Sequence, residues 1–127
     1  AGSVRVYKNV SGTWTQIGAD IDGEAASDNS GHIVSLSSDG TTVAIGAPYN
    51  DGSGTYAGSV RVYKNVSGTW TQIGDDIDGE AASDNSGYSV LGFKTLMQQG
   101  RLLMYYSNLV FNFKFASFQN NFFGIFN

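Results

Sequence analysis

The sequence predicts an all-β fold built from antiparallel, four-stranded units that repeat along the chain. Residues 57–90 repeat residues 1–34 with a period of 56, and such a period is typical of solenoids, propellers or arrays. The two copies differ at only three positions, which read Ala19 and Asp75, His32 and Tyr88, and Ile33 and Ser89. Short segments alternate apolar and polar residues, and 17 glycines with a single proline suit short strands joined by tight turns.

The first copy opens with two expected strands. Ser3–Lys8 alternates apolar and polar residues, which indicates a half-buried strand with its valines on the inner side. Ser11-Gly12 then makes a turn, and Thr13–Ile17 is the returning strand. A polar stretch, Asp20–Gly31, follows.

Two further strands are expected before the second copy begins. The residues Asp39-Gly40 between them predict a two-residue type I′ hairpin, in which both central residues need positive φ. Pro48 ends the second of these strands, and a polar loop at 49–57 leads into the next copy.

Four short strands per period are typical of one blade of a β-propeller. One complete blade is therefore expected at about residues 32–77, between partial blades. Its strands are predicted at His32–Ser37, Thr42–Ala47, Ser59–Asn65 and Thr69–Ile73, and Tyr88–Val90 begins the next blade. One four-stranded sheet cannot bury both faces alone, so residues 1–90 are read as a fragment of a β-propeller. Its open blade edges predict self-association.

The composition changes abruptly after Val90. All 11 acidic residues lie before this point and all eight phenylalanines after it. Residues 91–127 are read as a divergent, Phe-rich tail, with β-prone segments at Leu102–Tyr106 and Asn108–Phe115 that would cover the open blade edge. So sharp a boundary in mid-strand predicts a reading-frame change inside a longer repeat gene. Recombination with an unrelated segment is the alternative.

One pair of motifs leads to a known family. The segment Val43-Ala44-Ile45-Gly46-Ala47-Pro48 is followed, after a loop, by Gly58-Ser59-Val60-Arg61-Val62-Tyr63. This resembles the FG-GAP repeat of integrin-α-type β-propellers, in which Phe-Gly, Gly-Ala-Pro and Gly-x-Val-x-Val-Tyr recur in each blade. The resemblance covers residues 1–90. It implies an extracellular or cell-surface module for recognition or adhesion.

The chain departs from this family pattern at two places. The Phe-Gly position reads Ser30-Gly31 in one copy and Ser86-Gly87 in the other. The family's Asp-rich calcium loop is replaced by Ser37–Thr41, which holds one carboxylate, whereas Ca²⁺ takes six to eight oxygen ligands. Calcium is therefore not expected at the family's usual position.

The long loops of the predicted blade are the expected binding surface. In an up-and-down sheet, the connections Tyr49–Gly58 and Asp75–Gly87 fall on the same face, which the resemblance implies is the ligand face. Loops held by a rigid scaffold frequently carry binding residues. The candidates for contact with a protein or carbohydrate ligand are Tyr49, Asn50, Asp51 and Tyr56. The alternative is that Asn50–Gly54 is a flexible loop tip.

The same face is acidic, which raises a second candidate site. Carboxylates at i, i+2 and i+4 lie on one side of an extended chain and suit Ca²⁺. The metal candidates are Asp76, Asp78, Glu80 and Asp84. The alternative is a solvated loop whose Asp, Asn, Ser and Gly residues make local backbone hydrogen bonds.

Several residues have two interpretations. Trp14 and Trp70 are either sugar-stacking platforms or packing residues, and their mid-strand positions favour packing. Asn9 and Asn65 each begin an N-glycosylation acceptor, but each also lies in a plain hairpin turn. His32, the only histidine, is replaced by tyrosine in the second copy, which is not expected of a catalytic base.

Composition argues against several classes of function. The net charge of −4 argues against a nucleic-acid partner, and the absence of cysteine rules out disulfides. No apolar run is long enough to predict membrane insertion, and no signal peptide is visible. Without a catalytic motif, the chain is read as a non-enzymatic recognition module. The alternatives are a purely structural repeat array or an accessory propeller of a larger secreted hydrolase.

Overall fold

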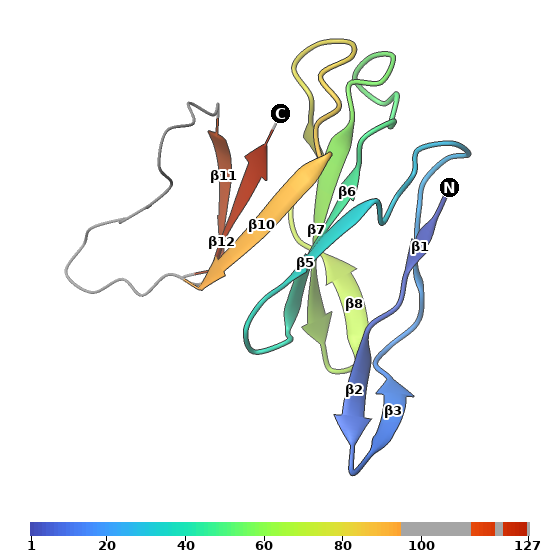
Figure 1. Cartoon of the computed structure of the whole chain (residues 1–127), viewed down its shortest axis with the longest axis vertical. Coiled ribbons are helices and arrows are strands. Elements are labelled where there is room, and N and C mark those ends of the chain that lie inside the picture. The colour runs from blue at the N-terminus through green and yellow to red at the C-terminus, as the bar shows by residue number, and fades with distance from the viewer. Residues whose placement is uncertain (95–112, 119–120, 127) are drawn as a thin grey trace, which may run out of the picture.

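The protein is an all-β chain of antiparallel strands (Figure 1). The computed structural model describes residues 1–94, 113–118 and 121–126. The strands are β1 (Ser3–Val4), β2 (Tyr7–Val10), β3 (Thr13–Gln16), β4 (Ile21–Asp22), β5 (Ile33–Leu36), β6 (Thr42–Ala47), β7 (Ser59–Val66), β8 (Thr69–Gln72), β9 (Ile77–Asp78), β10 (Ser89–Lys94), β11 (Phe113–Phe118) and β12 (Asn121–Phe126). This confirms the predicted all-β class and agrees with a propeller fragment.

The central blade is a sheet with the strand order β5-β6-β7-β8. Each neighbouring pair is antiparallel. Strand β9 also pairs with β7, at Ser59–Val60, while β8 pairs with the other end of β7, at Tyr63–Val66. The fourth strand of the blade is therefore interrupted, and its two pieces follow one edge of β7.

Both faces of the central blade are covered. One face packs against the first copy, in a buried cluster of Val4, Ile21, Val43, Ile45 and Tyr63. The other face packs against β10, in a buried cluster of Ala44, Val60, Val62 and Val90. Because both faces are covered, every residue of β6 is buried, and its sequence is almost entirely apolar. The core of this fold therefore lies between sheets, as repeat architectures require.

The first copy does not form the single strand that its alternation predicts at Ser3–Lys8. This prediction is wrong, because the structure has two short strands, β1 and β2, and they pair with β4 and β3. The identical segment of the second copy is one continuous strand, β7, with β6 hydrogen-bonded along it from Ser59 to Lys64. The described residues provide no such neighbour for the first copy, so local pairing divides the strand.

The tight turns differ in kind. Ser11-Gly12 and Ser67-Gly68 have positive φ at both residues, as a type I′ hairpin requires. At Asp39-Gly40, where the sequence predicts this turn, only Gly40 has positive φ. The prediction of a two-residue turn is wrong there, because the backbone N–H of Ser37 already bonds to the carbonyl of Thr42 and leaves four residues between them.

The carboxylate of Asp39 holds this longer turn together. Its Oδ1 accepts hydrogen bonds from Ser37 Oγ at 2.6 Å, from Thr41 Oγ1 at 2.8 Å and from the Thr41 backbone N–H at 3.0 Å. These bonds stabilise the ionised form, so the pKa of Asp39 falls from 3.8 to about 2. The only carboxylate of the turn is thus engaged inside it.

This lowered pKa predicts how the turn responds to acid. Asp39 stabilises the folded state above its unfolded pKa of 3.8, and that contribution is lost as pH falls towards about 2. An NMR titration of the Asp39 side-chain carboxyl carbon should therefore give a midpoint near pH 2. A Ser37→Ala, Thr41→Ala variant should move the midpoint up towards 3.8. A wild-type midpoint already near 3.8 would contradict this account.

The third sheet follows the central blade. Strand β10 runs to Lys94, past the predicted end at Val90, and pairs with β12, which in turn pairs with β11. The β-prone segment Asn108–Phe115 overlaps β11 only at its end, and Leu102–Tyr106 lies outside the described residues. The Phe- and Asn-rich end at 118–127, which contains β12, has no residue pattern from which a strand could be predicted. The origin of this segment in a reading-frame change stays a prediction.

The long connections gather at one end of the molecule. In Figure 1 the loops after β6 and after β9 lie together at the top, while the tight turns after β2, β5 and β7 lie towards the opposite end. The described residues include no helix long and apolar enough to cross a membrane.

Candidate functional site

The loop at 49–58 forms the centre of the candidate binding surface. Its backbone bonds to the acidic loop of the first copy, through Tyr49 N–H and the carbonyl of Asp28 at 3.3 Å. On its other side it accepts bonds from the acidic loop of the second copy, since Ser83 N–H donates to Thr55 and Asn85 N–H donates to Tyr56. Three loops, 20–31, 49–58 and 75–87, are thus joined into one surface, which we name the loop face.

Two tyrosines give this face an exposed aromatic pair. The rings of Tyr49 and Tyr56 pack edge to face, with their centres 5.6 Å apart. The residues are 40% and 51% exposed. Tyrosine offers a large apolar surface and a hydroxyl at low entropy cost, so such pairs suit recognition of protein or carbohydrate.

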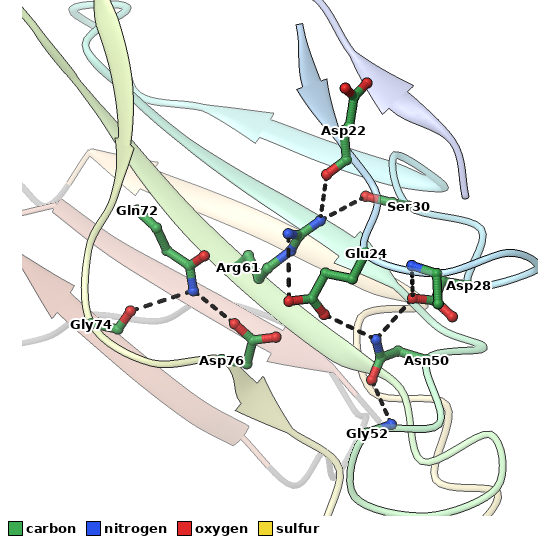
Figure 2. A network of polar contacts seen from close by, with 11 residues as sticks. Asp22, Glu24, Asp28, Ser30, Asn50, Gly52, Arg61, Gln72, Gly74 and Asp76 are labelled. Atoms are coloured by element: carbon green, nitrogen blue, oxygen red, sulfur yellow. Dashed lines mark hydrogen bonds and ion pairs between the residues drawn. The ribbon is translucent and has the colours of Figure 1, made fainter.

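Asn50 and Asp51 make hydrogen bonds that hold the loop carrying the two tyrosines. Asn50 is buried, and its amide nitrogen donates to Asp28 Oδ2 at 3.0 Å and to Glu24 Oε2 at 3.3 Å (Figure 2). The Asp51 carboxylate accepts the Tyr56 backbone N–H at 2.7 Å, where Tyr56 has a positive φ of 53°. The sequence groups these residues with the tyrosines as ligand contacts, but their bonds are made within the loop face.

Arg61 lies on β7, in the second copy, and its side chain contacts residues of the first copy. Its Nη2 donates to the carbonyl oxygen of Asp22 at 3.0 Å and to Ser30 Oγ at 3.4 Å, and its Nη1 lies 3.8 Å from Glu24 Oε1 (Figure 2). Its side chain is only 7% exposed. The guanidinium also lies 5.7 Å from the ring centre of Tyr63, whose pKa is raised by burial, an effect that Arg61 opposes.

The sequence analysis does not include Arg61 among the candidate residues, although its place in an apolar strand indicates a contact with another repeat. Strand alternation places it opposite Val60 and Val62, which suggests the solvent side. In a blade covered on both faces, however, a strand has no solvent side, and a lone arginine there needs acceptors from the adjoining repeat. The first copy provides these acceptors, as the carbonyl of Asp22, the hydroxyl of Ser30 and the carboxylate of Glu24.

The predicted metal residues have other partners. Asp76 Oδ1 accepts from the Gln72 amide at 2.7 Å (Figure 2), and Asp84 Oδ2 accepts the backbone N–H groups of Glu80 and Ala81. Across residues 1–94, 113–118 and 121–126, no three His, Asp or Glu side chains are grouped so that they could hold a metal. The local backbone bonds fit the alternative of a self-bonded loop, and calcium stays a prediction.

Three of the remaining candidates, Trp70, Asn9 and Asn65, make structural contacts. The indole nitrogen of Trp70 donates to the carbonyl of Ile17 in the preceding copy at 2.7 Å, so this tryptophan packs between repeats. Trp14 is exposed. Asn9 and Asn65 each accept the backbone N–H of the glycine three residues later, and so stabilise their hairpin turns. Glycosylation at either asparagine stays a prediction.

One family model matches part of the chain. Residues 14–63 match the model of the FG-GAP repeat. This segment is similar to the FG-GAP repeat. It begins at Trp14 in β3 and ends at Tyr63 in β7, so the matched unit spans the contact between the two copies. No curated protein and no solved structure matches the chain significantly.

The FG-GAP match supports a propeller-type repeat module. FG-GAP repeats are generally non-catalytic and typically occur in extracellular proteins. The matched segment contains the loop at 49–58 and the arginine that joins the copies, so the two features described above belong to the repeat itself.

Proposed function

We propose that this chain is a non-enzymatic recognition module of an extracellular or cell-surface protein, and that it binds a protein or carbohydrate ligand through the loop face. The observation that carries the proposal is the exposed Tyr49–Tyr56 pair on a loop held from both sides. An aromatic pair that is already ordered loses little conformational freedom when a ligand binds. The resemblance to integrin-α-type propellers supports the same face.

A direct binding test uses the full chain on a panel of defined oligosaccharides and of purified extracellular-matrix proteins. Removing both rings, in Tyr49→Ala with Tyr56→Ala, should weaken any binding seen with wild type by about 10-fold or more, because central aromatic residues dominate binding energy. Surface plasmon resonance gives the dissociation constants.

Tyr7→Ala provides the matched control. Tyr7 is 44% exposed, like the pair, but belongs to the β2–β3 hairpin, away from the long loops (Figure 1). It should leave binding unchanged. Equal losses in the control and in the double variant would place the contact elsewhere. A failure of wild type to bind any member of either panel would count against recognition as the function.

A structural array is the second candidate, and one observation favours it. The two acidic loops on the loop face are nearly identical in sequence, whereas ligand-binding loops usually diversify between repeats. In that case the contacts of Arg61 and Trp70 between copies would be the main purpose of the repeat. The binding experiment above separates the two, because a structural array predicts no ligand.

A further inference from the structure

The side chain of Trp14 is exposed, whereas its counterpart in the second copy packs against another repeat. Trp14 is 68% exposed. Trp70 donates its indole N–H to the carbonyl of Ile17 at 2.7 Å and packs on the apolar cluster between the copies. The two hairpins have the same sequence and the same turn, with φ of 51° at both Ser11 and Ser67. What differs between the two tryptophans is therefore the neighbouring repeat.

The contact of Trp70 in the first copy is formed by two residues, Ile17 and Gly18, which we name the first tryptophan socket. The Ile17 carbonyl accepts the indole N–H, and Gly18 lets the ring approach the backbone. A Cβ at Gly18 would lie 2.8 Å from the indole Cδ1 and 2.8 Å from the carbonyl oxygen of Gly68. Gly18 has φ of 71°, and the amide of Gln16 donates to its carbonyl at 3.2 Å.

The second copy forms the same socket from Ile73 and Gly74, which we name the second tryptophan socket. Gly74 has φ of 70°, and the amide of Gln72 donates to its carbonyl at 3.4 Å. Apart from the chain neighbours of Gly74, no atom of the described residues lies within 4 Å of the place that a Cβ on Gly74 would take. The second socket thus has the backbone conformation of the first and is open in the part of the chain that the structure describes.

One residue beside the two sockets differs between the copies. Asp75 follows Gly74, whereas Ala19 follows Gly18. Ala19 is exposed although Trp70 fills the adjoining socket, so a docked tryptophan does not cover this position. Asp75 is also exposed, and its carboxylate would keep its water when an indole enters the second socket.

The exposed tryptophan and the open socket lie at opposite ends of the pair of copies. Trp70 reaches from its own copy to the preceding one, and the identical hairpin presents Trp14 in the same direction along the repeat. This hairpin, β2–β3, projects beyond the central blade at the bottom of Figure 1. Gly74 belongs to the following copy, so Trp14 and Gly74 suit a contact between two chains.

We propose that Trp14 of one chain binds the second tryptophan socket of another copy of the chain, and so continues from molecule to molecule the contact that Trp70 makes with the first copy. The interface is head to tail, because each chain supplies the tryptophan at one end and the socket at the other. Such contacts give rings where the rotation closes and filaments where it does not. This differs from pairing of open strand edges and does not depend on a ligand at the loop face.

Two variants, each lacking one side of the contact, test the proposal. Trp14→Ala keeps the socket, while Gly74→Ala keeps the tryptophan and places a methyl group where the indole would lie. Sedimentation velocity should show that the wild-type full chain forms oligomers as its concentration rises. Each variant alone should associate about 10-fold more weakly or less, because a central tryptophan dominates such an interface. An equimolar mixture should form a dimer that grows no further, because it contains one intact contact.

Gly40→Ala is the matched control for the glycine variant. Gly40 has φ of 72° with no described atom within 4 Å of its added Cβ, and it lies in the turn after β5. It should lower the melting temperature as much as Gly74→Ala does, and leave association unchanged. The proposal is overturned by a monomeric wild type, by Trp14→Ala or Gly74→Ala associating as wild type does, or by a mixture of these two variants that forms no dimer.

Tryptophan fluorescence gives a second measurement that does not depend on stability. The chain has two tryptophans, so Trp70→Phe leaves Trp14 as the only one. Its emission should move to shorter wavelength, and its quenching by acrylamide should weaken, as the protein concentration rises. In Trp14→Phe, the emission of Trp70 should not change with concentration. If Trp14 were protected from acrylamide at every concentration, its partner would belong to the same chain, which contradicts the proposal.

Discussion

Replacing Arg61 with glutamine is expected to destabilise the protein by about 2–3 kcal/mol, because the change removes a buried cation from acceptors that stay behind. The carbonyl of Asp22 and the hydroxyl of Ser30 would lose their charged donor. Glu24 is 46% exposed, so water can solvate its carboxylate, which keeps the loss below that of a fully buried pair. Chemical denaturation followed by fluorescence measures the change.

The repeat supplies the control for this experiment. Arg5 occupies the same position in the first copy, but its side chain is 56% exposed and lies 3.8 Å from the exposed carboxylate of Asp20. Arg5→Gln should therefore change stability by about 0.5 kcal/mol or less. Equal effects at the two positions would show that burial between the copies is not what makes Arg61 important.

Replacing Gly46 with alanine is expected to cost about 3 kcal/mol, because two backbones meet where the methyl group would go. The added Cβ would overlap the carbonyl oxygen of Gly87 and lie 2.8 Å from Ile33 Cγ2. Gly87 leads into β10, so the substitution would push the third sheet away from the central blade. Thermal unfolding should show the loss as a melting temperature lowered by about 10 °C.

Gly68→Ala separates this overlap from the ordinary cost of removing a glycine. Gly68 lies in the β7–β8 turn with φ of 89° and has open space around it. Alanine there should cost only roughly 1–2 kcal/mol, from its backbone conformation alone. If Gly46→Ala were no more harmful than Gly68→Ala, the close approach of β6 to the residues before β10 would not be a tight contact.

Much of the fold could be predicted because the apolar–polar alternation and the 56-residue repeat indicate the same strands. The central blade follows from alternation, turn residues and Pro48, and each end of its four strands lies within one residue of the predicted position. The divided strand at β1 and β2 could not be predicted, because its sequence is identical to that of β7. What differs between the copies is the neighbouring strand, and that is a tertiary effect.

Less of the candidate site than of the fold could be predicted from the sequence. Tyr49 and Tyr56 could be picked out as loop residues, but their edge-to-face packing depends on the conformation that Asp51 imposes. Asn50 reads as a loop-tip residue and is instead buried between two carboxylates. Polar residues that serve the contact between copies look the same in sequence as residues that serve a ligand, since both kinds are rich in Asp, Asn and Ser.

The residues of the Arg61 contact are synthesised in a fixed order, with the first copy made before the arginine. Its acceptors precede it in the chain, Ser30 by 31 residues and Asp22 by 39. At a translation speed of roughly 5–20 residues per second, the loop that receives the guanidinium has been synthesised about 1.5 to 8 seconds before the arginine is added. When the arginine of a new repeat is synthesised, its acceptors in the preceding repeat are therefore already present. A growing chain of such repeats can fold from its N-terminal end while it is still attached to the ribosome.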